Sequence, residues 1–226
     1  MKKIAFIASL AVVGFGVSAF VAPKASTDDT FEGVVTYTIS VDNEQAASMM
    51  QNASIKTYIK GDKTKTVSDM GVYKNTTIAD RSKSDDPIIL IDAMGNKYQL
   101  KSDPTKKKDD KDPVIKYTDD TKKIAGYNCH KAEITVTDDQ GQSYTTNIYY
   151  TEDIVTPPAK SGQFKGLKGF PLEFSIKQQG MNMVLSATNV TKQSVSDDTF
   201  TVPSGYKLMT REEMQADIQK NMSSGN

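Results

Sequence analysis

The sequence predicts a mainly β (α+β) protein: a curved antiparallel half-barrel of about nine to eleven strands with two covering helices. The first observation behind this prediction is the alternation of apolar and polar residues with a period of two, which recurs along most of the chain. The second is the spacing of these stretches, because most connections have the length and composition of hairpin turns. Consecutive hairpins produce an antiparallel meander.

The first strand is expected at residues 31–41, where Val35, Tyr37 and Ile39 alternate with threonine and serine. Gly61 lies in a turn between the second and third strands. One apolar face per strand implies a sheet that is curved and covered on one side. The remaining strands are expected at residues 55–60, 63–67, 72–79, 88–92, 97–100, 114–117, 127–137, 143–150, 172–179 and 181–190.

Two short helices complete the predicted fold. The first is expected at residues 43–51, with Asp42 as its N-terminal cap. The second begins after Thr210, which forms a capping-box pattern with Glu213. Its apolar stripe consists of Met214, Ile218 and Met222.

The N-terminus has the pattern of a secretory signal peptide. Lys2 and Lys3 precede an uncharged apolar run at residues 4–22, and small residues occur near its end. We expect cleavage after Ala19, so that residues 1–19 are removed. The alternative is an uncleaved membrane anchor, since the run is nearly long enough to span a bilayer.

Cleavage after Ala22 or Ala25 also stays open. Residues 20–29 are expected to form a flexible N-terminal segment, and residues 30–222 a single β domain that includes the C-terminal helix. We therefore expect a periplasmic or secreted protein.

Composition excludes several classes of function. Basic and acidic residues number 28 each, and this balance argues against nucleic-acid binding, which requires a basic surface. The chain has one cysteine, so it forms no intrachain disulfide and no cysteine-rich zinc site. We expect no cofactor, no metal site and no nucleic-acid partner.

The chain also offers little for catalysis. Its single cysteine and single histidine are adjacent, as Cys129 and His130, and adjacent strand residues point to opposite faces. They therefore cannot act as a nucleophile and its base on a regular strand. The Asp-Asp doublets do not match the spacing of a calcium loop, so we expect no catalytic residues and no enzymatic activity.

The stretch from residue 155 to 171 combines lysines with large apolar residues and contains no acidic residue. This pattern suits an interface with lipid headgroups or a protein partner. The alternative is a loop that tucks its apolar side chains into the rim of the core. The interface candidates are Phe164, Lys165, Leu167, Lys168 and Phe170.

A strongly curved sheet diverges from the elements that cover it, so its concave face can enclose a ligand cavity. Strand alternation selects the side chains expected to line that face. His130 is expected there as a polar contact for a headgroup. The cavity candidates are Val35, Tyr37, Ile39, His130, Ile134, Val136, Ile148, Tyr150, Leu172, Phe174, Ile176, Met181, Met183 and Leu185.

Several stretches also resemble known families. FEGVVTYTIS, IKTYIKGDKTKT, KKIAGYNCHKAEITV and IYYTEDI together resemble the family of bacterial envelope proteins called domain of unknown function 4412. GLKGFPLEFSI, residues 166–176, is similar to the motif of the GLPGLI family of exported proteins from Bacteroidetes, and departs from it at Lys168 and Phe170. The resemblance covers most of residues 31–210. It implies a fold similar to the lipoprotein-localisation proteins LolA and LolB, with helices over an apolar cavity, and it supplies no catalytic residue.

Two functions follow as hypotheses. The first is an exported, non-enzymatic binder or carrier of an acyl chain, lipid or lipoprotein in the apolar cavity. The second is an envelope interaction or stress-related protein that binds a protein partner and uses its apolar face as core. In both cases we expect any contact with the membrane to be peripheral.

Overall fold

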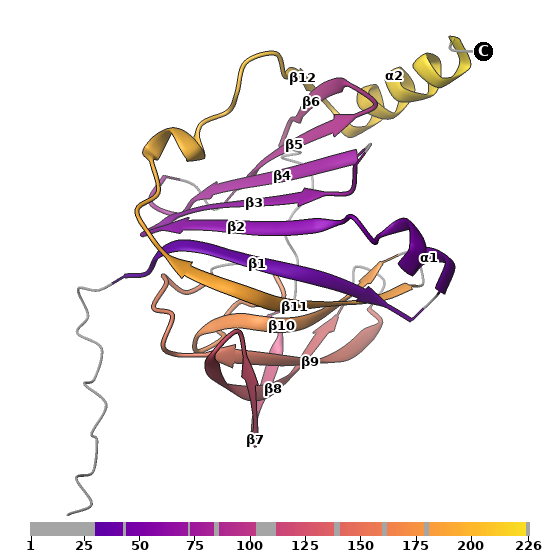
Figure 1. Ribbon diagram of the computed structural model, residues 1–226. Helices are drawn as coiled ribbons and strands as arrows, with labels where there is room; N and C mark the ends of the chain where they lie inside the picture. The colour runs from indigo at the N-terminus through magenta and orange to yellow at the C-terminus, as the bar shows by residue number, and fades with distance from the viewer. Residues whose placement is uncertain are drawn as a thin grey trace, which may run out of the picture.

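The computed structural model describes residues 30–42, 44–71, 73–83, 86–102, 112–137, 141–159, 162–178 and 181–224. The predicted signal peptide and the segment that follows it lie outside the described residues. The described chain is mainly β, as the sequence predicts, and its strands form one open, curved sheet (Figure 1).

The sheet contains twelve strands in the order β12-β6-β5-β4-β3-β2-β1-β11-β10-β9-β8-β7. Neighbouring strands are antiparallel, except that β12 pairs with β6 in parallel. The strands are β1 (Glu32–Val41), β2 (Ser54–Lys60), β3 (Lys63–Asp69), β4 (Tyr73–Asp80), β5 (Ile88–Ala93), β6 (Asn96–Leu100), β7 (Val114–Ile124), β8 (Tyr127–Thr137), β9 (Ser143–Thr151), β10 (Phe170–Gln178), β11 (Met181–Lys192) and β12 (Lys207–Met209).

Two meanders meet in the middle of this sheet. Strands β1 to β6 follow one another to one edge, and β7 to β11 return from the opposite edge until β11 pairs with β1 (Figure 1). Val35 lies opposite Val190 in this central pair, and Tyr37 lies opposite Ala187 after a β-bulge. The bulge increases the local twist of the strand.

The strands depart from the prediction in two places, because β12 is an additional strand and β7 is longer than expected. The short strand β12 has too few residues to show an alternation. Strand β7 extends to Ile124, well beyond the predicted end at residue 117. The sequence pattern misses this extension because residues 118–123 lie on an edge of the sheet. Such an edge position carries polar and charged residues on both faces, so the two-residue pattern disappears.

Both helices form where the sequence predicts them, but they cover less of the sheet than expected. Helix α1 (Glu44–Met49) lies beside the ends of β1 and β2, while α2 (Arg211–Ser224) packs Met214 against Ile91 and Tyr98 of β5 and β6 (Figure 1). Helices therefore cover only one end of the concave face, and a loop covers the rest. Neither α-helix in the described part of the chain has the length and hydropathy needed to cross a membrane.

The N-terminus of α2 confirms the predicted capping box. The Thr210 hydroxyl accepts a hydrogen bond from the Glu213 amide at 3.2 Å, and the Glu213 carboxylate accepts one from the Thr210 amide at 2.8 Å. Ile218 packs in the same cluster as Met214, whereas the side chain of Met222 lies outside the described residues.

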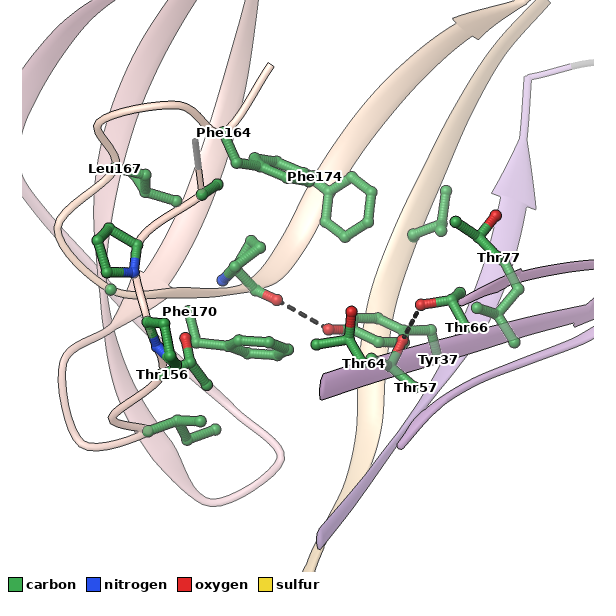
Figure 2. A pocket seen from close by; sticks show the side chains of 18 of the residues that line it. Tyr37, Thr57, Thr64, Thr66, Thr77, Thr156, Phe164, Leu167, Phe170 and Phe174 are labelled. Carbon is green, nitrogen blue, oxygen red and sulfur yellow. Dashed lines mark hydrogen bonds between the residues drawn. The ribbon is translucent and has the colours of Figure 1, made fainter. Parts of the chain in front are cut away.

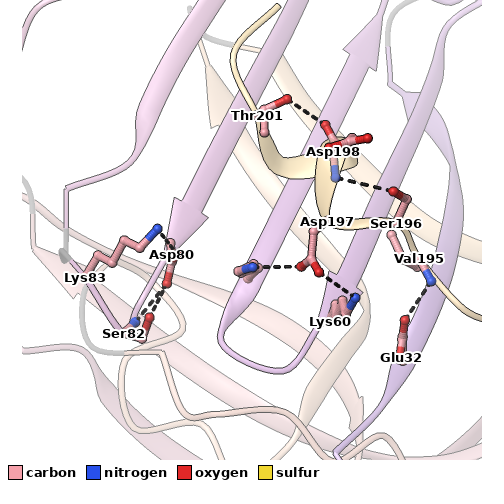
Figure 3. A network of polar contacts seen from close by, with 11 residues as sticks. Glu32, Lys60, Asp80, Ser82, Lys83, Val195, Ser196, Asp197, Asp198 and Thr201 are labelled. Carbon is pink, nitrogen blue, oxygen red and sulfur yellow. Dashed lines mark hydrogen bonds and ion pairs between the residues drawn. The ribbon is translucent and has the colours of Figure 1, made fainter.

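An outer segment, residues 193–206, crosses the convex face of the sheet and contains the short 3-10 helix η1 (Asp197–Phe200). Its anchor is Asp197, whose carboxylate accepts hydrogen bonds from Lys60 at 3.2 Å and Lys63 at 2.8 Å (Figure 3). The Val195 amide donates to the Glu32 carboxylate at 2.7 Å. These contacts hold the segment on the side of the sheet that faces away from the cavity.

Candidate functional site

The concave face of the sheet and a loop enclose a cavity of about 720 Å³. The loop is the covering segment, defined here as residues 152–159 and 162–169, and it connects β9 to β10. The sheet contributes side chains from β1 to β4, β10 and β11. A volume of this size lies within the range of binding sites for small molecules.

One wall of the cavity is apolar and aromatic. Phe164 of the covering segment meets Phe174 of β10 edge to face, with 5.0 Å between ring centroids, and Phe174 meets Tyr37 at 5.9 Å (Figure 2). Such edge-to-face contacts hold aromatic rings in fixed orientations. The apolar wall consists of Phe164, Leu167, Phe170, Phe174, Ile176 and Leu185.

The opposite wall consists of hydroxyl side chains on β2, β3 and β4. The strand register places Thr57 opposite Thr66, and Thr66 opposite Thr77, so three threonines form a row across three strands (Figure 2). The Oγ1 atoms of Thr57 and Thr66 lie 3.0 Å apart and share a hydrogen bond. Thr64 and Ser68 flank Thr66 on β3 and also line the cavity. We call these five residues the hydroxyl wall.

Among the described residues, three charged side chains line the cavity: Arg81, Lys168 and Glu152. Arg81 follows β4, and its Nη1 donates a 2.6 Å hydrogen bond to the carbonyl oxygen of Pro157. Burial lowers the pKa of the Arg81 guanidinium from its ordinary value, which still leaves it charged. Lys168 and Glu152 are exposed, so the partly buried charge of the cavity is positive.

Backbone contacts fix the covering segment in place. The Phe31 amide donates to the Val155 carbonyl at 2.8 Å, and just after the segment the Tyr37 hydroxyl donates to the Pro171 carbonyl of β10 at 2.9 Å. Burial raises the pKa of Tyr37, so this hydroxyl stays protonated as a donor. A Cβ at Gly169 would lie 2.5 Å from the Thr151 carbonyl oxygen, so only glycine allows the segment to approach β9 this closely.

The predicted cavity residues divide into three groups. Tyr37, Phe174, Ile176 and Leu185 line the cavity. A second group packs into the protein's own core or is half buried there, and consists of Val35, Ile39, Ile134, Val136, Ile148, Tyr150, Leu172 and Met183. The side chain of Met181 lies outside the described residues, and His130 is exposed at the end of the face, with its ring 6.1 Å from that of Tyr150.

The predicted interface residues lie around the same cavity. Phe164, Leu167 and Phe170 point into it, as in the alternative in which the loop tucks its apolar side chains into the rim of the core. Lys168 is exposed at the cavity, where its ammonium lies 5.0 Å from the centre of the Tyr117 ring. Lys165 forms an ion pair with Asp112.

The hydroxyl wall and Arg81 are among the lining residues that the sequence pattern does not single out as site residues. The hydroxyl wall has a signal in the sequence, because Thr64, Thr66 and Ser68 alternate with other residues along one strand. Strand alternation thus predicts a shared face, but it does not tell which face is concave. Arg81 has no comparable signal, since it stands in a turn.

Cys129 and His130 do not form a catalytic pair in this arrangement. They lie on opposite faces of β8, and Cys129 is fully buried whereas His130 is exposed. Burial raises the pKa of the Cys129 thiol to about 11, which keeps it protonated and poorly nucleophilic near neutral pH. Among the described residues, no cluster of histidine, cysteine, aspartate and glutamate has a geometry that would hold a metal ion.

Comparison with known proteins identifies a family for most of the chain. No curated protein matches the sequence. The family model described as "Domain of unknown function (DUF4412)" matches residues 31–206, which span β1 to the residue before β12 and include both walls of the cavity. The chain therefore belongs to the DUF4412 family.

Proposed function

We propose that this protein is an exported, non-enzymatic binder that holds the acyl chain of a lipid or lipoprotein in the cavity under the covering segment. The observation that carries the proposal is the apolar wall, where Phe164, Phe170 and Phe174 border an unfilled volume instead of closing it. Large apolar side chains normally pack to crystal-like density, so a cavity of this size beside them favours a ligand.

The energy of such binding is sufficient for a carrier. Burying one methylene group contributes about 0.8 kcal/mol, so twelve methylenes contribute roughly 10 kcal/mol before the cost of ordering the chain and the protein. The remainder suits a reversible complex in the micromolar range or tighter. Similarity to the half-barrel of lipoprotein-localisation proteins, suggested by the sequence motifs, agrees with this proposal.

An interaction protein without a ligand is the second candidate. The observation that favours it is the filled face of β8 and β9, where Ala132, Ile134 and Ile148 are completely buried by the protein itself. If the whole concave face serves as core, the residues around the cavity should affect stability and leave lipid binding undetectable.

Titration with a fluorescent long-chain fatty acid tests the proposal. We expect saturable binding of one molecule per chain at micromolar concentration. Thr66→Phe should reduce that affinity at least about tenfold, because a phenyl ring from the hydroxyl wall fills the cavity without removing any core side chain.

The matched control is Thr145→Phe on β9. Thr145, like Thr66, pairs its hydroxyl with a cross-strand threonine, here Thr135 at 2.7 Å, but it is exposed and remote from the cavity. The Thr145→Phe variant should bind the fatty acid with the same affinity as the unmodified protein. Absence of saturable binding to the folded protein, or equal effects of both variants, would contradict the proposal and favour the interaction protein.

A further inference from the structure

The volume of the cavity limits the size of its occupant. Pockets of roughly 300–1,000 Å³ hold single drug-sized molecules, and the cavity of about 720 Å³ lies within that range. A fatty acid of about twelve to eighteen carbons is a molecule of this size. A diacyl phospholipid has roughly twice as many atoms, so the cavity suits an amphiphile with a single chain.

The hydroxyl groups of the cavity extend along β3 from Thr64 to Ser68, whereas its partly buried charge, Arg81, lies at one end. The Arg81 amide donates to the Asp62 carbonyl at 3.1 Å, which places Arg81 beside the turn between β2 and β3. Thr64 lies near the same turn, opposite Ala79, two residues before Arg81. The strand register thus brings a guanidinium and a hydroxyl to the same end of the cavity.

The opposite end is apolar on the β10–β11 side. Ile176 lies opposite Met183, and Leu185 lies opposite both Phe174 and Ile39, further along the strands from the β2–β3 turn. A molecule that lies along the strands therefore meets the positive charge of Arg81 and the Thr64 hydroxyl at one end. At the other end it lies between aliphatic side chains of β10 and β11 and Ser68 of β3.

We propose that Arg81 and Thr64 form the headgroup site for a single-chain amphiphile with an anionic head, of which a fatty-acid carboxylate is the simplest member. This inference rests on the proposed function and specifies its ligand. The guanidinium carries N–H donors in a planar fork that matches a carboxylate, one of which bonds the Pro157 carbonyl, and the Thr64 hydroxyl supplies a further donor.

The surroundings of Arg81 favour an anion there. Its guanidinium is partly removed from water, and burial lowers its pKa, so an approaching anion meets weaker screening than at the surface. Among the described residues, two carboxylates lie near this site: Asp62, which interacts electrostatically with Arg81, and Glu152, which lines the cavity, and both are exposed to solvent. Their repulsion of a bound carboxylate is therefore screened more strongly than the attraction of Arg81.

Calorimetric titration with dodecanoate and with dodecan-1-ol tests this site, because the two ligands share a chain and differ in the charge of the head. Both are used below the concentration at which they self-associate. We expect dodecanoate to bind about tenfold or more tightly than the alcohol, as a charge-assisted hydrogen bond would give.

Three variants assign the preference to Arg81. Arg81→Gln should reduce dodecanoate affinity about tenfold and leave dodecanol affinity nearly unchanged, whereas Arg81→Lys should retain most of the preference for the acid. Arg211→Gln is the matched control, because Arg211 is exposed at the start of α2, and it should bind both ligands like the unmodified protein.

The outcomes separate this inference from the proposed function. Equal binding of acid and alcohol, or an Arg81→Gln variant that weakens both alike, would overturn the headgroup site and leave acyl-chain binding in place. Binding of neither ligand to the folded protein would contradict the proposed function and the headgroup site with it.

Discussion

Two regions of one sheet face meet the covering segment in different ways. On β8 and β9, Ile134 and Ile148 are completely buried, and Leu167 of the covering segment packs against them. On β2 to β4, the hydroxyl wall faces the same segment across the cavity. Strand alternation points side chains toward the covering segment in both regions. The size and polarity of these side chains therefore decide whether the space beneath the segment is filled.

The contacts of the covering segment explain why the same loop fills one region and not the other. Over β8 and β9 it presents Leu167, which closes an apolar surface. Near β4 its contact is the hydrogen bond between Arg81 and the Pro157 carbonyl, a polar link that holds the loop without filling the space beneath. We therefore expect substitutions in the filled region to change mainly the stability of the fold, and substitutions around the cavity to change mainly ligand binding.

The largest expected effect is on stability in the filled region. Ile148→Ala removes a completely buried side chain and should lower the free energy of unfolding by about 3 kcal/mol. Thr77→Ala in the hydroxyl wall should cost less than about 1 kcal/mol, because its side chain borders the cavity. Urea denaturation measures both, and equal losses would contradict the comparison.

Leu185→Ala lies at the border between the two regions and should show both effects. Leu185 is 4% exposed and lines the cavity, so its truncation should destabilise the protein by about 2 kcal/mol and enlarge an existing space. Loss of this apolar contact should also weaken fatty-acid binding several-fold. Thermal unfolding with and without ligand measures the two effects, and a loss of stability with unchanged binding would place the ligand elsewhere.

A smaller effect is expected where α2 covers the end of the sheet. Thr210→Ala removes the hydroxyl that caps the first turn of α2 and should cost about 1 kcal/mol. Thr201→Ala, in the outer segment, provides a comparison that leaves α2 intact. Circular dichroism during denaturation measures the change, and a Thr210→Ala variant as stable as the unmodified protein would show that α2 contributes little to the fold.

The smallest effect is expected at the outer segment, and it depends on pH. Hydrogen bonds from Lys63 and then Lys60 lower the pKa of Asp197, so the carboxylate stabilises the folded state at neutral pH. That contribution is present above the ordinary aspartate pKa and disappears as pH falls through the lowered value. Asp197→Asn should therefore be slightly less stable than the unmodified protein at pH 7 and indistinguishable from it in strong acid.

Denaturation of both proteins over this pH range checks the sign of the effect. Asp198→Asn serves as the neighbouring control. A difference between Asp197→Asn and the unmodified protein that grows as pH falls would contradict the assigned ion pairs.

The sequence predicts the sheet well, because strand alternation and turn residues are local signals. Val35, Tyr37 and Ile39 share a face as the pattern indicates, and the capping box of Thr210 and Glu213 forms as expected. The alternation does not predict the polar end of β7, which lies at an edge of the sheet. Both expected helices form, but the covering segment lies over most of the concave face, because no local signal specifies which element lies there.

The cavity is harder to predict than the strands that line it. Whether Ile148 is core and Leu185 borders a cavity depends on where the covering segment lies, and that placement arises from long-range contacts such as the hydrogen bond between Phe31 and Val155. Arg81 is likewise brought to the cavity by the register of β3 and β4, since its position in a turn carries no periodic signal.

Photo-crosslinking tests most directly whether the cavity between the two walls holds the ligand. The protein is irradiated with a fatty acid that carries a photoreactive group near the end of its chain, and the labelled peptides are mapped by mass spectrometry. We expect labels on β3, on β10 and on the covering segment, competed by unmodified fatty acid and lost in Thr66→Phe. Labels confined to β7 and β8, or labels that excess fatty acid does not reduce, would contradict the account.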